Sequence, residues 1–239
     1  MGGNAEYGPL WFTAHLLVYS LGYVALRTLL APGRAVTQPV AAPGHLGVLG
    51  FVLALGSATA ALRPLYPIDE WVRLAANVPA EPGRVPQYLG LFVVGIVAGR
   101  GDWFRTFDSR VAVVWAALGV LAWVVGVSTL PQEALIDAHP LTAVWGLLEA
   151  IVGVGAILGL TVLFRRWCNA PGRWLGRLEG QTYGVYLIHI FVVIALQFAV
   201  LDLAWPALAK FAVVWAAALV VSFAVVAALR LIPPVRAVV

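Results

Sequence analysis

Three side chains that can exchange a proton lie within long apolar segments of this 239-residue chain: His15, Glu149 and His189. A neutral imidazole can act as a general base, and a carboxylate can accept a hydrogen bond from a hydroxyl group. Because a titratable side chain in the core of a bilayer is energetically unfavourable, each is a candidate catalytic residue. The alternative for the histidines is a hydrogen bond that serves helix packing alone.

Glu149 allows three interpretations, because an ionised carboxylate facing lipid would be very unfavourable. The carboxyl group is protonated, paired with a cation or a histidine, or open to an internal water-filled cavity. His15 and His189 are candidate partners.

Aromatic and polar residues share helix faces with the two histidines. Trp11, His15 and Tyr19 follow one another at intervals of four residues, and Tyr186 lies three residues before His189. Residues at these spacings lie on one side of a helix. The residues predicted to line a substrate cavity are Trp11, Tyr183, Tyr186 and Gln197.

The composition predicts an integral membrane protein. Hydrophobic residues make up 62% of the chain and charged residues 11%, far from the balance of soluble domains. We expect an all-α polytopic bundle that forms one transmembrane domain over residues 1–239. The net charge of +4 reflects arginines in short loops and does not indicate a nucleic-acid partner. The single cysteine excludes an internal disulfide and a cysteine-based metal site, and no metal or bound cofactor is expected.

Seven apolar segments are candidates for membrane-spanning helices. A span needs roughly 20 apolar residues, and the third segment is the shortest. The segments are residues 8–30, 44–62, 86–99, 109–129, 140–164, 182–201 and 208–231.

Positive residues fall mainly on one side of these segments. Of the 15 lysines and arginines, Arg63, Arg73, Arg84 and Lys210 lie on one side and all the others on the opposite side. Because positive residues favour the cytoplasm, we expect an outside N-terminus and a cytoplasmic C-terminus. The cytoplasmic loop over residues 165–181 includes four candidates for binding donor phosphates: Arg165, Arg166, Arg173 and Arg177. The alternative is that this loop only follows the positive-inside bias.

Two shorter segments also carry predictions. Asp69 can cap a short helix that lies flat at the membrane interface with Trp71 as its anchor, and a plain surface loop is the alternative. Residues 153–155, Gly-Val-Gly, are expected to allow close helix packing.

The order of several motifs resembles the membrane acyltransferase family 3. The motifs are Gly-Pro-Leu-Trp-Phe at residues 8–12, Pro-Gln-Tyr at 86–88, Trp145 to Glu149, and Thr-Tyr-Gly-Val-Tyr-Leu-Ile-His at 182–189. The resemblance covers essentially the whole chain, which is similar to the C-terminal seven helices of a ten-helix fold. The first three helices of that fold, with an arginine and a histidine base, have no counterpart here.

The resemblance implies an inner-membrane, multi-pass acyltransferase. The donor would be acyl-CoA, the group most often acetyl, and the acceptor a hydroxyl of a cell-surface carbohydrate or related metabolite, as in O-acetylation of polysaccharides. We also expect a partner chain that supplies the three helices, or else a truncated or degenerate copy. The alternative is a transporter-like or accessory membrane scaffold without catalytic activity.

Overall fold

The computed structural model describes two compact helical units. The described residues are 10–30, 40–68, 70–73, 78–131, 133–136, 139–169, 172, 176 and 178–236. The larger unit covers Ala14–Asn169, and the smaller unit combines Met1–Thr13 with Ala170–Val239.

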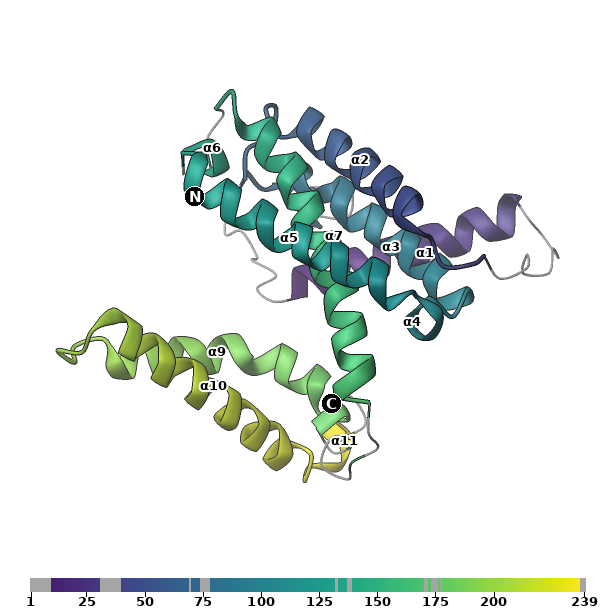
Figure 1. The fold of residues 1–239 in the computed structure, drawn as a ribbon. Helices are drawn as coiled ribbons and strands as arrows, with labels where there is room; N and C mark the ends of the chain where they lie inside the picture. The colour runs from purple at the N-terminus through teal and green to yellow at the C-terminus, as the bar shows by residue number, and fades with distance from the viewer. Residues whose placement is uncertain are drawn as a thin grey trace. The chain divides into compact units, whose positions relative to one another are not determined.

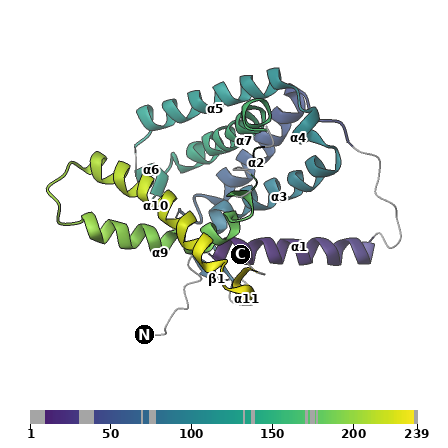
Figure 2. The same ribbon diagram turned by 90° about the horizontal axis from the view of Figure 1, so that it is seen from below.

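The larger unit is a bundle in which α7 packs between α5 and α2 (Figure 1; Figure 2). Its elements are most of α1 (Trp11–Leu30), α2 (His45–Leu62), β1 (Val72–Arg73), β2 (Pro79–Ala80), η3 (Pro82–Arg84), α3 (Val85–Arg100), α4 (Trp103–Thr106), α5 (Ser109–Thr129), α6 (Glu133–Ile136) and α7 (Thr142–Trp167). The buried core lies between α2, α5 and α7 and includes Val52, Leu55, Trp115, Ala150 and Val154.

Glycine permits the close approach of α5 and α7. A Cβ atom on Gly155 would lie 2.4 Å from the Trp115 carbonyl oxygen and 3.1 Å from the Gly119 Cα. Around a Cβ on Gly153, by contrast, the structure has no atom within 4 Å among the described residues. The prediction of close packing at residues 153–155 is therefore confirmed at Gly155 and not at Gly153.

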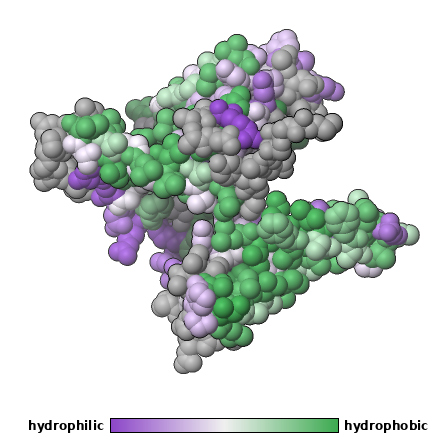
Figure 3. All heavy atoms as spheres, turned by 180° about the vertical axis from the view of Figure 1, so that it is seen from behind, coloured by the Kyte–Doolittle hydropathy of each residue, from purple (hydrophilic) through white to green (hydrophobic). Residues whose placement is uncertain are grey.

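The smaller unit is an antiparallel helical hairpin. It consists of the first residues of α1 together with α9 (Thr182–Val200), α10 (Ala207–Leu229) and α11 (Pro233–Arg236). At the loop end, Lys210 Nζ donates a hydrogen bond to the Leu201 carbonyl, 2.6 Å away. At the other end, Arg230 Nη1 donates to the Gly180 carbonyl at 2.7 Å. Figure 3 shows an almost continuous hydrophobic surface along this hairpin, which suits a lipid environment.

The helices match the seven predicted segments. Of the described helices, α2, α5, α7, α9 and α10 are long and apolar enough to span a membrane. The prediction of a polytopic helical bundle is thus confirmed. Helix α3 has 16 residues and is about 24 Å long, shorter than a hydrocarbon core of roughly 30 Å.

The predicted flat helix after Asp69 is wrong over residues 71–73. Val72 and Arg73 form β1, which pairs antiparallel with β2. Val72 is β-branched and favours extended backbone, and its partners Ala80 and Pro79 complete a two-residue ladder. Asp69 itself lies outside the described residues.

Candidate functional site

An ion pair between Arg63 and Glu149 forms the centre of a polar cluster in the larger unit. Arg63 follows the last residue of α2 and is completely buried, whereas the Glu149 side chain on α7 is 25% exposed. Arg63 Nη2 donates a hydrogen bond to Glu149 Oε2, and Gln87 Nε2 on α3 donates to the same oxygen at 3.2 Å. Of the three interpretations of Glu149, the structure therefore shows pairing with a cation, and that cation is an arginine.

The pair leaves part of each group unused. Within the described part of the chain, Arg63 Nε and Nη1 are buried without a hydrogen-bond partner. Glu149 Oε1 likewise has no hydrogen bond to another described residue. The pair thus fixes the carboxylate through one oxygen and leaves the other for a hydroxyl group.

A short covering segment lies over Arg63. Glu81 is buried and pairs with Arg84 at 3.0 Å. Burial lowers the pKa of Arg84, but Glu81, followed by Tyr88 and Glu149, outweighs that effect and raises it above its ordinary value. A Cβ on Gly83 would lie 2.6 Å from the Tyr66 carbonyl oxygen and 3.5 Å from Arg63 Nε, so a glycine there lets the backbone approach the buried guanidinium.

His15 belongs to the same cluster, and both of its ring nitrogens are engaged. Its Nε2 lies 2.8 Å from the Pro79 carbonyl oxygen, and its Nδ1 lies 3.1 Å from the Tyr19 hydroxyl. Because a carbonyl oxygen only accepts, Nε2 carries the proton, and in the neutral ring Nδ1 accepts from Tyr19. With 3% of its surface exposed, His15 joins α1 to β2 and has no lone pair free for a substrate.

The N-terminal turn of α3 connects the two halves of this cluster. Gln87 contacts Glu149, while the ring of the next residue, Tyr88, lies 6.0 Å from the His15 ring. The structure thus brings two predicted site residues, His15 and Glu149, to one end of the bundle. It also adds Arg63 and Gln87, which the sequence analysis did not select.

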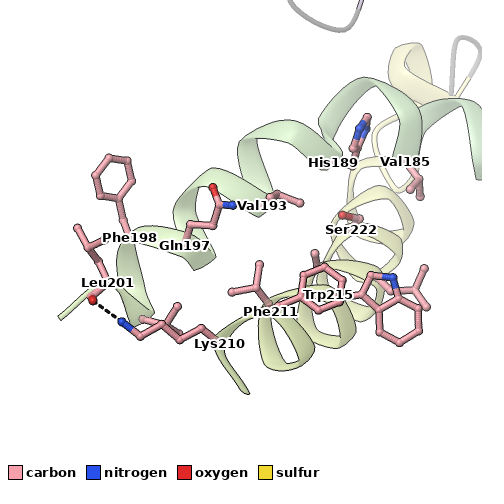
Figure 4. Close-up of a pocket in the computed structure, with 14 residues that line it drawn as sticks. Val185, His189, Val193, Gln197, Phe198, Leu201, Lys210, Phe211, Trp215 and Ser222 are labelled. Atoms are coloured by element: carbon pink, nitrogen blue, oxygen red, sulfur yellow. Dashed lines mark hydrogen bonds between the residues drawn. The ribbon is translucent and has the colours of Figure 1, made fainter. Parts of the chain in front are cut away.

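His189, the third predicted residue, lies in the smaller unit. It lines a groove of about 840 Å³ between α9 and α10 together with Gln197, Trp215 and Ser222 (Figure 4). Its Nδ1 lies 2.7 Å from the Tyr186 carbonyl oxygen, so Nδ1 carries the proton. In the neutral ring Nε2 then keeps its lone pair, and it has no hydrogen-bond partner among the described residues.

The other residues predicted to line a substrate cavity lie in different surroundings. Gln197 lines the groove, Tyr183 is exposed, and Tyr186 contacts the ring of Phe12 at 6.4 Å. Trp11 contacts Phe12 edge to face.

Arg165, one of the predicted donor-phosphate residues, holds a turn of the protein. Its Nη1 donates to the carbonyl oxygens of Arg105 and Phe107 at 2.9 and 3.0 Å, and its Nη2 donates to Ser109 Oγ at 2.8 Å. These bonds connect the end of α7 to the α4–α5 turn. Arg166 is exposed, and Arg173 and Arg177 lie outside the described residues.

Long apolar helices with a few interior polar clusters define a multi-pass membrane protein. The comparison with protein families is more specific, because the model of the acyltransferase domain of family 3 matches residues 3–231. The chain therefore belongs to the membrane acyltransferase family 3 and is a membrane acyltransferase. Neither the curated proteins nor the solved structures gave a match.

Proposed function

We propose that this protein transfers an acyl group from acyl-CoA to a hydroxyl of a cell-surface carbohydrate or a related metabolite, at the inner membrane. The acceptor oxygen attacks the thioester carbonyl, a carbon–oxygen bond forms, and the carbon–sulfur bond breaks. The hydroxyl proton passes to a base and then to the CoA thiolate. The family resemblance favours acetyl, and the length of the acyl chain is a variable that the assay measures.

The assignment of the base rests on the hydrogen bond between His189 and the Tyr186 carbonyl. A general base needs an accessible lone pair and a fixed ring. In His189, which lines the groove, the Tyr186 carbonyl fixes the tautomer and Nε2 has no partner among the described residues, whereas both nitrogens of His15 are engaged. We therefore assign the base to His189 and a structural role to His15.

We propose separately that the polar cluster around Glu149, in the larger unit, binds sugar hydroxyls. Sugar hydroxyls are recognised by carboxylate and amide oxygens, and Glu149 Oε1 and the Gln87 side chain supply both types. In the orientation expected from the arginines, this end of the bundle faces outward. The contacts of α1 agree with this topology: His15 contacts Pro79 near the start of α3, and Tyr23 contacts Arg100 at its end, so the two helices run parallel.

The test is acceptor-dependent release of CoA by the full chain in nanodiscs, with a panel of acyl-CoA donors and glycan acceptors. His189→Asn keeps a donor for the Tyr186 carbonyl but has no base, and we expect kcat/KM to fall by about 10²- to 10⁴-fold. His45→Asn, at the start of α2, is the matched control and should keep the wild-type rate.

Two results would count against the proposal. Wild-type activity in His189→Asn together with lost activity in His15→Asn would reverse the assignment of the base. The scaffold alternative predicts that replacing His15, Glu149 and His189 together leaves acyl transfer in cells intact and alters uptake or complex assembly. The expected partner chain with further helices stays a prediction.

A further inference from the structure

A second cavity lies in the larger unit between its middle and the end at which α3 stops, and along α7 its lining begins at Val154, five residues after Glu149. It has a volume of about 260 Å³ and is formed by the first turns of α2, the second half of α3, the α4 turn and the second half of α7. Residues from each element that line it include Phe51, Gly95, Phe104 and Leu158.

The described side chains that line this pocket are almost all apolar, and their few polar atoms are already hydrogen-bonded. Among the lining residues that the structure describes, only Trp103 and Thr161 have polar side-chain atoms. Trp103 Nε1 donates to the Val40 carbonyl at 2.7 Å, and Thr161 Oγ1 donates to the Ile157 carbonyl at 2.7 Å. A cavity of this kind excludes water and accepts hydrocarbon.

The same end of the bundle is rich in arginine. Arg100 ends α3, Arg105 lies in α4, and Arg110 lies in the first turn of α5. Arg105 and Arg110 are exposed; Arg105 Nε lies 4.0 Å from Asp102 Oδ1, an exposed pair that an incoming phosphate can replace, and Asp108 is the other nearby carboxylate in these turns. An apolar pocket beside exposed cations complements a ligand that joins a hydrocarbon chain to phosphates.

We propose that this pocket holds the hydrocarbon chain of the acyl-CoA donor, with the donor phosphates on the exposed arginines. The transferred group is then an aliphatic chain longer than acetyl, because acetyl would leave the pocket empty. A methylene group is similar in size to the share of about 30 Å³ that one water occupies in the liquid, so the pocket has room for roughly eight carbon atoms. The proposal rests on the proposed function and names the class of its donor.

Arg165 supports one wall of the pocket. Its hydrogen bonds to the Arg105 and Phe107 carbonyls hold the turn that carries Phe104 and Phe107, both lining residues. The arginine expected to bind phosphate therefore positions the aromatic wall against which the chain would lie.

Two glycines of α3 provide a matched pair of variants. Gly95 lines the pocket and Gly99 does not, yet a Cβ on either residue would meet no atom within 4 Å from the other described parts of the chain. Gly95→Leu therefore fills the pocket without a backbone clash, and Gly99→Leu makes the same chemical change one turn away. Both variants gain the same helix propensity.

The experiment compares kcat/KM for acetyl-, butyryl-, hexanoyl- and octanoyl-CoA in nanodiscs of phosphatidylethanolamine and phosphatidylglycerol. We expect the wild type and Gly99→Leu to prefer hexanoyl or octanoyl over acetyl. Each methylene excluded from an apolar site lowers kcat/KM about fourfold. Gly95→Leu, which adds four carbons, should therefore lower the octanoyl-to-acetyl ratio by on the order of a hundredfold.

A binding measurement separates this proposal from the proposed function. Equilibrium binding of radiolabelled octanoyl-CoA to the full chain in nanodiscs is measured without an acceptor, and only Gly95→Leu should weaken it. If binding follows chain length but no acceptor is acylated, the pocket proposal stands and the proposed function fails. If acetyl-CoA is preferred, or if both leucine variants keep one chain-length ratio, the pocket proposal is overturned and acyl transfer stands. The pocket proposal is also overturned if a photoreactive phosphatidylglycerol labels the pocket and octanoyl-CoA does not displace that lipid.

Discussion

The Arg63–Glu149 pair should dominate the stability of the larger unit. Glu149→Ala leaves a guanidinium charged and completely buried, and loss of one partner of a buried pair costs about 3–5 kcal/mol. Glu149→Gln keeps the shape and one acceptor oxygen, so we expect a smaller loss of about 1.5–3 kcal/mol, the value of a hydrogen bond to a charged group. Arg63→Met combined with Glu149→Leu removes both charges and should recover most of the stability.

The assay is reversible unfolding of the full chain in detergent micelles, followed by tryptophan fluorescence. It compares Arg63→Met, Glu149→Leu and the variant that carries both changes. The two substitutions should be strongly coupled, because the cost of each single change is the charge that it leaves behind. If the effects of Arg63→Met and Glu149→Leu add to within about 0.5 kcal/mol, the two side chains act independently and the reasoning fails.

Three further changes test other contacts. Gly155→Ala should destabilise the α5–α7 contact by about 1–3 kcal/mol in the same unfolding assay, because its Cβ meets a backbone oxygen. Gly153→Ala should be neutral or stabilising, and equal effects of the two changes would contradict the close approach. Tyr19→Phe removes the donor to His15 Nδ1 and should cost about 1 kcal/mol, measured by thermal unfolding, and no loss would contradict the tautomer assignment. A lysine at position 165 cannot reproduce the planar fork of hydrogen-bond donors of the guanidinium group. Arg165→Lys should therefore accelerate amide hydrogen exchange in the α4–α5 turn and leave it unchanged in α2. Unchanged exchange in the turn would refute the role of Arg165 in holding it.

The helices could be predicted closely from the sequence, because segment length and hydrophobicity follow directly from the thickness of a bilayer. All seven predicted segments correspond to helices whose ends agree within about one turn. The flat helix after Asp69 failed because capping describes a local preference only, and the pairing of Val72 with Ala80 overrides it.

The site was less predictable, since residue spacing fixes which residues share a helix face but not which helix that face meets. Glu149 was selected because a carboxylate within a span needs a partner, yet that partner, Arg63, lies 86 residues away. Arg63 looked like an ordinary loop cation, because nothing in its local sequence indicates that it is buried. The different states of His15 and His189 depend on carbonyl oxygens of the backbone, whose positions only the folded structure supplies.

The buried pair also constrains the order of biosynthesis. The charged end of α2 leaves the ribosome long before α7, and at roughly 5–20 residues per second, 86 residues take about 4–17 s. During that interval the Arg63 guanidinium must remain hydrated or be shielded by the insertion machinery, because its carboxylate has not yet been made. The α2–α7 interface is therefore completed late in translation, and a nascent chain halted before residue 149 should hold α2 at the water boundary.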